Sequence, residues 1–265
     1  MTGSKKSLGE EEKPMRTRRP RLLGPIPFLL LCGMAYLAFA WSFAEGADPS
    51  LARLIEGFRK TTIASVADAV DEVTGQRGFM YHDMRPLFKA KVVGPAVTAW
   101  LRPSIKASGP TGPSHSLLAI DEAEPGSVVV IVVEEGLDIS GIGGLMATAC
   151  KARGLAGAVI DGAARDIDEI EALEFPVFSR SITPATSVGR YVSVGKNIPV
   201  QCAGVTVNPD DLIVGGSDGV VVVPRDKAAQ ILEIAQKIDE KEAQMVPMIK
   251  ELKSILKAVE KFKRL

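Results

Sequence analysis

The sequence has few aromatic residues and no net charge. Of its 265 residues 5% are aromatic, and 32 Lys and Arg residues balance 32 Asp and Glu residues. Surfaces that bind nucleic acids attract phosphate with excess positive charge and often stack bases on aromatic rings, and this composition favours neither. We therefore expect no nucleic-acid partner.

Cysteine and histidine are too sparse to predict a zinc site. The three Cys residues include no CxxC pair and have no nearby His. Cys32 lies in an apolar N-terminal run, and we interpret Cys150 and Cys202 as buried free thiols. A disulfide is the alternative if the domain is exported. The two His residues, His82 and His115, lie far apart in the sequence, and we interpret both as polar or capping residues rather than as catalytic bases.

Residues 1–44 have the composition of a targeting segment. A basic stretch at residues 15–21 precedes an apolar run at residues 26–40, and small residues follow up to Ala44. This order is that of a secretory signal peptide with cleavage after Ala44, so we expect an exported protein, periplasmic or secreted. Residues 22–44 are also long enough to span a membrane, and an uncleaved membrane anchor is the alternative.

The rest of the chain alternates apolar runs with helical patterns, which is typical of one α/β domain. The predicted strands span residues 91–101, 127–133, 155–160, 175–178, 200–207 and 212–223, and the predicted helices span residues 51–58, 65–73, 143–153 and 166–173. A capping box at Ser65–Asp68 would open the second helix. Residues 102–114, rich in Pro, Gly and Ser, predict a loop.

This pattern places the α/β domain at residues 49–225 and a C-terminal helical extension at residues 226–265. An apolar stripe runs along the extension, and Pro247 is expected to break its helix. A helical tail of this kind packs either on its own domain or on a neighbouring subunit.

The stretch from Gly141 to Glu169 joins a glycine-rich turn to a helix and a strand. Its spacing is not the dinucleotide-binding GxGxxG, since Met146 occupies the last glycine position and a loop precedes it. What remains is a glycine-rich approach to a helix N-terminus, whose free N–H groups suit a carboxylate or a phosphate. A packing turn that needs glycine explains this feature equally well.

Arg165 and Asp166 follow a predicted strand, and ligands gather outside the carboxyl ends of strands in α/β sheets. They therefore predict a small-molecule site. The alternative for Asp166 is an N-cap that forms a capping box with Glu169, and the alternative for Arg165 is a surface ion pair.

Three runs together resemble the family of 4-hydroxy-4-methyl-2-oxoglutarate aldolases and the regulator of ribonuclease E activity A. The runs are VGPAVT at Val93–Thr98, the block Gly143–Asp166 that ends in VIDGAARD, and VTVNPDDL at Val205–Leu212 followed by DGVVVVP at Asp218–Pro224. The resemblance implies an α/β domain of the swivelling β/β/α type with C-terminal helices. It also implies a ring-shaped homotrimer with sites between subunits.

The same resemblance implies a lyase that depends on Mg²⁺, or on another divalent cation such as Mn²⁺. Such an enzyme releases pyruvate from a 2-keto acid by retro-aldol cleavage or decarboxylation. The family's Arg-Asp pair maps onto Arg165, which would stabilise the enolate, and Asp166, which would hold the metal. Its carboxylate-binding loop maps onto Gly143, Gly144, Leu145 and Met146.

The resemblance also implies an acidic residue that comes from the C-terminal helix of a neighbouring subunit and helps to orient water. Glu242 or Glu240 is the candidate for it in this chain. The chain departs from the family pattern at Gly144, where many relatives carry an acidic residue, and at Asn208–Asp211, which replaces Pro-Gly-Asp. A non-catalytic binding or regulatory protein is the alternative function, although an exported protein would not meet a cytoplasmic ribonuclease. The particular keto acid does not follow from the sequence.

Overall fold

The computed structural model describes residues 49–104 and 114–263. The predicted leader at residues 1–44, its Cys32 and most of the predicted loop at residues 102–114 lie outside these two ranges. Within them, no helix combines the length and the apolar character that crossing a membrane requires.

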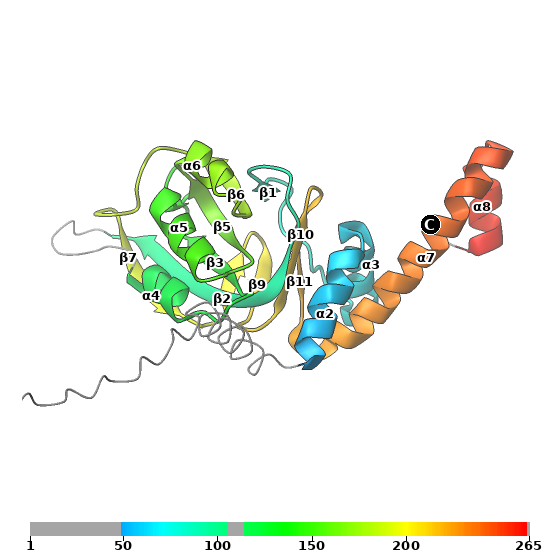
Figure 1. The fold of residues 1–265 in the computed structure, drawn as a ribbon, viewed down its shortest axis with the longest axis horizontal. Coiled ribbons are helices and arrows are strands. Elements are labelled where there is room, and N and C mark those ends of the chain that lie inside the picture. The colour runs from blue at the N-terminus through cyan, green and yellow to red at the C-terminus, as the bar shows by residue number, and fades with distance from the viewer. Residues whose placement is uncertain (1–48, 105–113, 264–265) are drawn as a thin grey trace, which may run out of the picture. The chain divides into compact units, whose positions relative to one another are not determined.

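A mixed, barrel-like sheet occupies the centre of the domain (Figure 1). Its main path runs β1-β6-β5-β3-β2-β10-β11, with β4 paired to β5 and β7 paired to β2. The strands are β1 (Arg85–Pro86), β2 (Val92–Pro103), β3 (Val128–Val133), β4 (Ser140–Ile142), β5 (Gly157–Ala164), β6 (Val177–Ile182), β7 (Tyr191–Lys196), β10 (Leu212–Gly216) and β11 (Gly219–Val223). The neighbours β2, β3, β5 and β6 are parallel, whereas β10 pairs antiparallel with β2 and β11.

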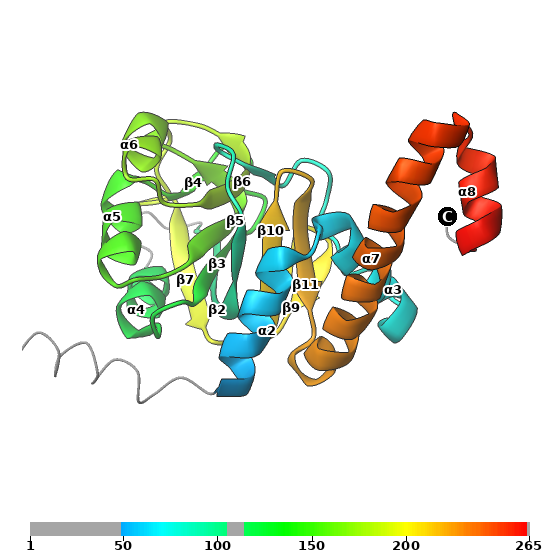
Figure 2. The ribbon, with the colours of Figure 1, turned by 45° about the vertical axis from the view of Figure 1, so that its right-hand side comes forward.

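Helices cover the sheet in two groups, which Figures 1 and 2 separate. The α-helices of the described residues are α2 (Pro49–Lys60), α3 (Ile63–Thr74), α4 (Ser114–Glu122), α5 (Gly144–Ala152), α6 (Ile167–Ala172), α7 (Ala228–Leu252) and α8 (Ile255–Phe262), of which α8 packs on α7 and not on the sheet. The group α4, α5 and α6 packs beside β2, β3 and β5, while α2, α3 and the first part of α7 pack at β10 and β11. Asp48–Leu265 forms one compact unit.

Continuous β-branched runs form the core, as the sequence predicts for strands buried on both faces. All six residues of β3, VVVIVV, are buried. Their side chains alternate between two apolar clusters, one under α4 and α5 and the other under a separate two-stranded hairpin of β8 (Val200–Cys202) and β9 (Val205–Val207). The predicted swivelling-type α/β fold with C-terminal helices is confirmed.

Two predicted strands are hairpins in the structure. Residues 200–207 turn back at Ala203 and Gly204, whose φ angles of 45° and 83° are both left-handed. Two consecutive residues with positive φ match the tight turns that suit β-hairpins, but Ala gives no sequence signal for one. Residues 212–223 likewise form the β10–β11 pair. The sequence also failed to predict β1, β4, β7 and α4.

The expected break at Pro247 is wrong. Helix α7 continues through Pro247 to Leu252, and the chain turns at Lys253, which has a φ of 49°. Beyond this turn α8 folds back onto α7, and Met245 and Ala258 are buried. We infer that this packing outweighs the hydrogen bond that proline removes.

Helix α3 begins at a different cap from the predicted one. The Ser65–Asp68 capping box is wrong, because the N-cap is Thr62, whose side chain accepts a hydrogen bond from the Ser65 N–H. Asp239 of α7 completes this terminus. Its carboxylate accepts hydrogen bonds from the Thr62 N–H at 3.0 Å, from Thr62 Oγ1 at 2.8 Å and from Ser65 Oγ at 2.7 Å. One side chain therefore ties α7 to the start of α3.

Asp239→Ala should lower the free energy of unfolding by about 2 kcal/mol, because it leaves three donors at the start of α3 without their charged acceptor. Urea unfolding followed by circular dichroism measures this change. The matched control is Gln236→Ala, an exposed position on the same helix, which should stay within about 0.5 kcal/mol of the parent chain. Equal stability of the two variants would show that Asp239 does not hold the helices together.

Candidate functional site

Strand β5 delivers Arg165 and Asp166 to the edge of the sheet. The strand runs to Ala164, four residues beyond its predicted end at Ile160, so the pair follows the strand directly. The short strand β4 pairs with the end of β5, and the Arg165 N–H donates to the Ile142 carbonyl at 3.1 Å. Because β4 leads into the N-terminus of α5, this pairing brings the glycine turn against the Arg-Asp pair.

The carboxylate of Asp166 lies at the start of α5. Its Oδ2 atom accepts a hydrogen bond from the Gly144 N–H at 3.0 Å and lies 3.6 Å from Nε of Arg165. The N-terminal dipole of α5 favours a negative charge at this position. The Arg165 and Asp166 side chains are 40% and 41% exposed, so the pair is open to solvent and to a ligand.

Asp166 does not act as a side-chain cap for its own helix. It occupies the N-cap position of α6, but its backbone is left-handed (φ 55°, ψ 47°) and its side chain makes no capping hydrogen bond. Side-chain caps normally have extended backbones, which direct the side chain toward the first turn. The capping alternative for Asp166 is therefore wrong.

A hollow of about 550 Å³ lies between α5 and α6. The residues that line it are Gly144, Leu145, Thr148, Asp166, Glu169, Ala172 and Leu173. Leu145 is 89% exposed, whereas Met146 is half-buried against the core and does not line the hollow. Of the predicted site residues, Gly144, Leu145 and Asp166 thus line the hollow. Gly143 and Arg165 lie beside Asp166 without lining it, and the Met146 side chain is turned inward.

The first turn of α5 offers hydrogen-bond donors to this hollow. The Ala147 N–H bonds to the Gly143 carbonyl and the Gly144 N–H bonds to Asp166. Within the described ranges, the N–H groups of Leu145 and Met146 have no acceptor. Free N–H groups at a helix N-terminus suit a carboxylate.

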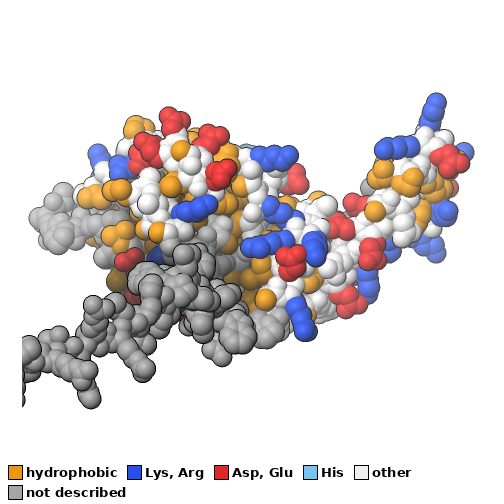
Figure 3. Space-filling model, viewed as in Figure 1, with side chains coloured by type: hydrophobic (Ala, Val, Ile, Leu, Met, Phe, Trp, Pro, Cys, Tyr) orange, Lys and Arg blue, Asp and Glu red, His pale blue; other side chains and the backbone are white. Residues whose placement is uncertain are grey.

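The donor set around Asp166 fits a magnesium site that water and substrate complete. Oδ1 of Asp166 accepts no hydrogen bond from the described residues, and no cluster of three or more metal-binding side chains exists among them. A single protein carboxylate can suffice for Mg²⁺, which keeps several waters. Acidic side chains gather over α6 (Figure 3), which carries Asp168, Glu169 and Glu171, and their charge favours a cation nearby.

Glu240 and Glu242 do not join this site within one chain. Both lie on α7, which packs on α2 and α3, and neither lines the hollow beside Asp166. Any role for them requires a second copy of the chain.

The two cysteines of the domain are buried and free, as predicted. Cys150 packs in the core under α5 and Cys202 lies in the cluster under the β8–β9 hairpin, so the disulfide alternative is wrong. Burial raises the pKa of the Cys150 thiol to about 12 and the pKa of the Cys202 thiol well above its usual value. Neither thiol is therefore a nucleophile at neutral pH.

An ion-pair network that the sequence did not predict holds the middle of β5. Arg180 on β6 donates to both oxygens of Asp83 at 2.8–3.1 Å and to Oδ1 of Asp161 at 3.0 Å. The other oxygen of Asp161 accepts a hydrogen bond from the Ala203 N–H at 2.6 Å. The Arg180 guanidinium lowers the pKa of Asp83. Arg180 lies two residues beyond the predicted end of its strand, between two serines, so the sequence carries no clear signal for this network.

Fold and site together define an α/β protein with a swivelling-type sheet and an Arg-Asp pair at a helix N-terminus. The model of the RraA-like family (Aldolase/RraA) matches residues 63–222, and the chain belongs to this family. A protein from Halalkalibacterium halodurans, provisionally named a 4-hydroxy-4-methyl-2-oxoglutarate aldolase, is 37% identical over 185 residues, which cover 69% of this chain and 82% of that protein.

Solved structures agree with this assignment. An uncharacterized protein from Pseudomonas syringae pv. tomato is 27% identical with a TM-score of 0.72, covering 79% of this chain and 93% of its own. RraAS2 from Streptomyces coelicolor is described as an unusual member of the RNase ES inhibitor RraA family. It is 26% identical with a TM-score of 0.65, and the match covers 77% of this chain and 98% of RraAS2. The family thus includes proteins named as enzymes and proteins named as inhibitors.

Gly143→Ala should displace the Arg-Asp pair with little loss of stability. A Cβ atom at Gly143 would lie 2.6 Å from Oδ2 of Asp166 and 3.0 Å from Nε of Arg165, and both atoms belong to flexible side chains that can move away. A crystal structure of the variant should show the Asp166 carboxylate removed from the Gly144 N–H.

Gly144→Ala is the matched control for this variant. Its Cβ would meet its nearest neighbour, Cβ of Glu169, at 3.4 Å, which is ordinary contact. An unmoved Asp166 carboxylate in Gly143→Ala would contradict the geometry described here.

Proposed function

We propose that the chain is a divalent-metal-dependent lyase that cleaves or decarboxylates a 2-keto acid and releases pyruvate. The observation that carries this proposal is the meeting of a guanidinium, an accessible carboxylate and free helix N–H groups at Arg165, Asp166 and the start of α5. The relatives provisionally named as aldolases support a small-molecule substrate and carbon–carbon lyase chemistry.

The start of α5 binds the carboxylate of the keto acid in this proposal. Because Gly144 already donates its N–H to Asp166, the N–H groups of Leu145 and Met146 make the contacts. The positive end of the α5 dipole adds to this attraction. We expect the keto group of a substrate bound in this way to face Arg165, whose Nε atom lies 3.6 Å from Oδ2 of Asp166.

Arg165 then stabilises the charge that cleavage creates. In a 4-hydroxy-2-keto acid the 4-hydroxyl gives its proton to a water molecule and the C3–C4 bond breaks. C4 leaves as the carbonyl carbon of an aldehyde or ketone, and the electron pair of the broken bond forms the enolate of pyruvate. The enolate takes a proton at C3 to give pyruvate. Decarboxylation reaches the same enolate by loss of CO₂. With Nε beside Asp166, the terminal N–H groups of Arg165 remain available for the enolate oxygen.

Asp166 would hold the metal through its unpaired Oδ1 atom. Mg²⁺ or Mn²⁺, when bound, supplies a Lewis acid that polarises the keto group. Glu169 lines the same hollow and is placed to orient water. Its Cβ atom lies 3.4 Å from the position that a Cβ atom of residue 144 would take, so its side chain starts beside Gly144.

A non-catalytic binding protein is the second candidate. The similarity to RraAS2, described within an inhibitor family, favours it, and the absence of an acidic side chain at Gly144 agrees with it. Such a protein would keep the Arg-Asp pair but would not release pyruvate from any 2-keto acid.

Asp166→Asn should abolish most metal-dependent activity. The substitution removes the carboxylate charge from the metal site, so the rate of pyruvate release should fall by at least about 100-fold while the melting temperature stays close to that of the parent chain. The assay follows pyruvate from a panel of 4-hydroxy-2-keto acids and β-carboxy-2-keto acids with and without Mg²⁺.

Glu171→Gln is the control for Asp166→Asn, since it removes a carboxylate from α6 outside the hollow. It should keep near-parent activity. Normal Mg²⁺-dependent turnover in Asp166→Asn would refute the metal-ligand role, and a parent chain inactive on the whole panel would favour the binding protein.

We also propose that the chain assembles as a ring-shaped homotrimer, in which Glu240 or Glu242 of one copy reaches the site of the next. The exposed apolar side chains of α7 and α8 support assembly, because isolated surfaces seldom expose this much apolar area. Leu252, Ile255 and Leu256 are 39%, 62% and 64% exposed, and Figure 3 shows apolar surface on α7 and α8.

Light scattering on the purified chain should give the mass of a trimer or of a multiple of one. Paired substitution of Ile255 and Leu256 by Gln should shift the distribution toward smaller species by removing apolar contact area. An active monomer would contradict a site shared between subunits.

Export by residues 1–44 stays a prediction, since these residues lie outside the described ranges.

A further inference from the structure

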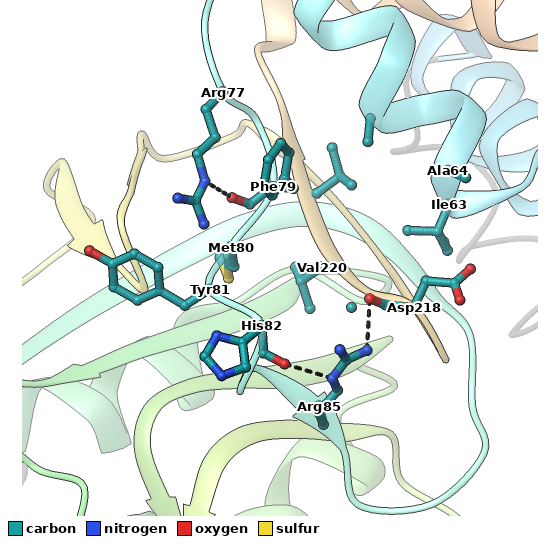
Figure 4. Close-up of a pocket in the computed structure, with 13 residues that line it drawn as sticks. Ile63, Ala64, Arg77, Phe79, Met80, Tyr81, His82, Arg85, Asp218 and Val220 are labelled. Atoms are coloured by element: carbon teal, nitrogen blue, oxygen red, sulfur yellow. Dashed lines mark hydrogen bonds between the residues drawn. The ribbon is translucent and has the colours of Figure 1, made fainter. Parts of the chain in front are cut away.

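A second cavity lies on the β10–β11 side of the sheet, with none of the residues of the hollow at Asp166. Its volume is about 430 Å³, within the range of small-molecule sites. The residues that line it are Ile63, Ala64, Ala67, Arg77, Phe79, Met80, Tyr81, His82, Arg85, Asp218, Gly219, Val220 and Val221. They come from α3, from the segment that leads into β1 with Arg85 of β1 itself, and from the β10–β11 turn with the start of β11 (Figure 4).

The floor of this cavity is apolar and buried. Ile63, Met80, Val220 and Val221 are each at most 8% exposed, and Ala64 and Ala67 of α3 add only methyl groups to the wall. Such a surface binds an apolar group by removing it from water, and it offers no side-chain hydrogen bond to a polar one.

The rim of the cavity carries two guanidinium groups that form no ion pair with a carboxylate of the described residues. Arg77 and Arg85 border the cavity with His82 between them (Figure 4). Neither guanidinium takes part in an ion pair among the described residues. The nearby carboxylate of Asp218 points away from Arg85, which instead bonds to the Asp218 backbone carbonyl at 2.9 Å.

Both guanidinium groups are nevertheless held in place. Arg77 donates from Nε to the Phe79 carbonyl at 2.7 Å, and its Cζ lies 4.5 Å and 5.1 Å from the ring centres of Phe79 and Tyr81. Arg85 donates from Nε to the His82 carbonyl at 2.7 Å. Contacts to neutral carbonyls and rings fix the position of a cation without cancelling its charge, and they leave terminal N–H groups for a ligand.

We propose that this cavity binds a small organic acid, with its carboxylate on the guanidinium of Arg77 and its apolar body on the floor beneath α3. The ligand is amphiphilic because the rim of the cavity is positively charged and its floor is apolar. A fully polar anion would leave the apolar floor wet, and a neutral apolar molecule would leave the guanidinium groups without a partner. This site is separate from the lyase site and does not depend on its function.

Calorimetric titration of the full chain with acetate, butanoate and hexanoate tests the proposal. Each added methylene that reaches the floor should tighten binding about fourfold. Hexanol, which lacks the charge, should bind at least about tenfold more weakly than hexanoate. Equal affinity for the three acids, or equal affinity for hexanol and hexanoate, would overturn the amphiphilic site.

Variants locate the bound acid. Arg77→Gln should weaken hexanoate about tenfold, because it removes a charged donor, whereas Arg59→Gln, which removes a charge from α2 outside the cavity, should not. Arg165→Gln should leave hexanoate binding unchanged. If Arg165→Gln weakens hexanoate and Arg77→Gln does not, the acid binds at the Asp166 site and the proposal is wrong.

A further variant tests the apolar floor and can be used if an Arg substitution unfolds the chain. Ala64→Leu adds apolar bulk from the exposed start of α3, so it should weaken hexanoate several-fold more than acetate. The same loss for both acids would show that the floor is not used. If none of the three acids gives a binding signal, the proposal is wrong. This includes the case in which a neighbouring copy of the chain covers the cavity.

Discussion

The short parallel pairing between β4 and the end of β5 is the constraint on which the candidate site depends. Only three residues form β4, yet their pairing fixes where the chain leaves the sheet for α5. The turn that follows sets the Gly144 N–H against the Asp166 carboxylate. Without this pairing, the helix N-terminus and the Arg-Asp pair would be two unrelated features at one end of a sheet. The site is therefore a property of backbone register more than of any single side chain.

Strand β5 serves a second purpose through Asp161. The Arg180 network anchors the segment before β1 and the β8–β9 hairpin to the middle of the strand, while the last residues of the same strand support the Arg-Asp pair. Partly buried ion pairs that share one guanidinium and satisfy their remaining oxygens are costly to disrupt singly. The strand is thus held at its middle as well as at its end, which fixes the direction in which Arg165 and Asp166 leave it.

The sequence predicted the buried strands and most helices, because apolar periodicity reports burial directly. It did not predict the turn at Ala203, the helix α4 or the continuation of α7 through Pro247, since each of these depends on contacts with distant residues. The Arg-Asp pair was found from its place after a strand and from family resemblance. The hydrogen bond from Gly144 was not predicted, because it needs a left-handed Asp166 and a three-residue strand that has no periodicity of its own.

Strand β2 pairs with β3, β7 and β10, and β10 is distant in the sequence: Pro95 of β2 lies opposite Leu212. Contacts of such long sequence separation form late, because the entropy of closing the intervening loop must be overcome first. During synthesis, one edge of β2 stays unpaired until almost the whole chain has left the ribosome. The nascent protein therefore exposes an apolar strand edge until β7 and β10 have been made, and such an edge favours aggregation while it lasts.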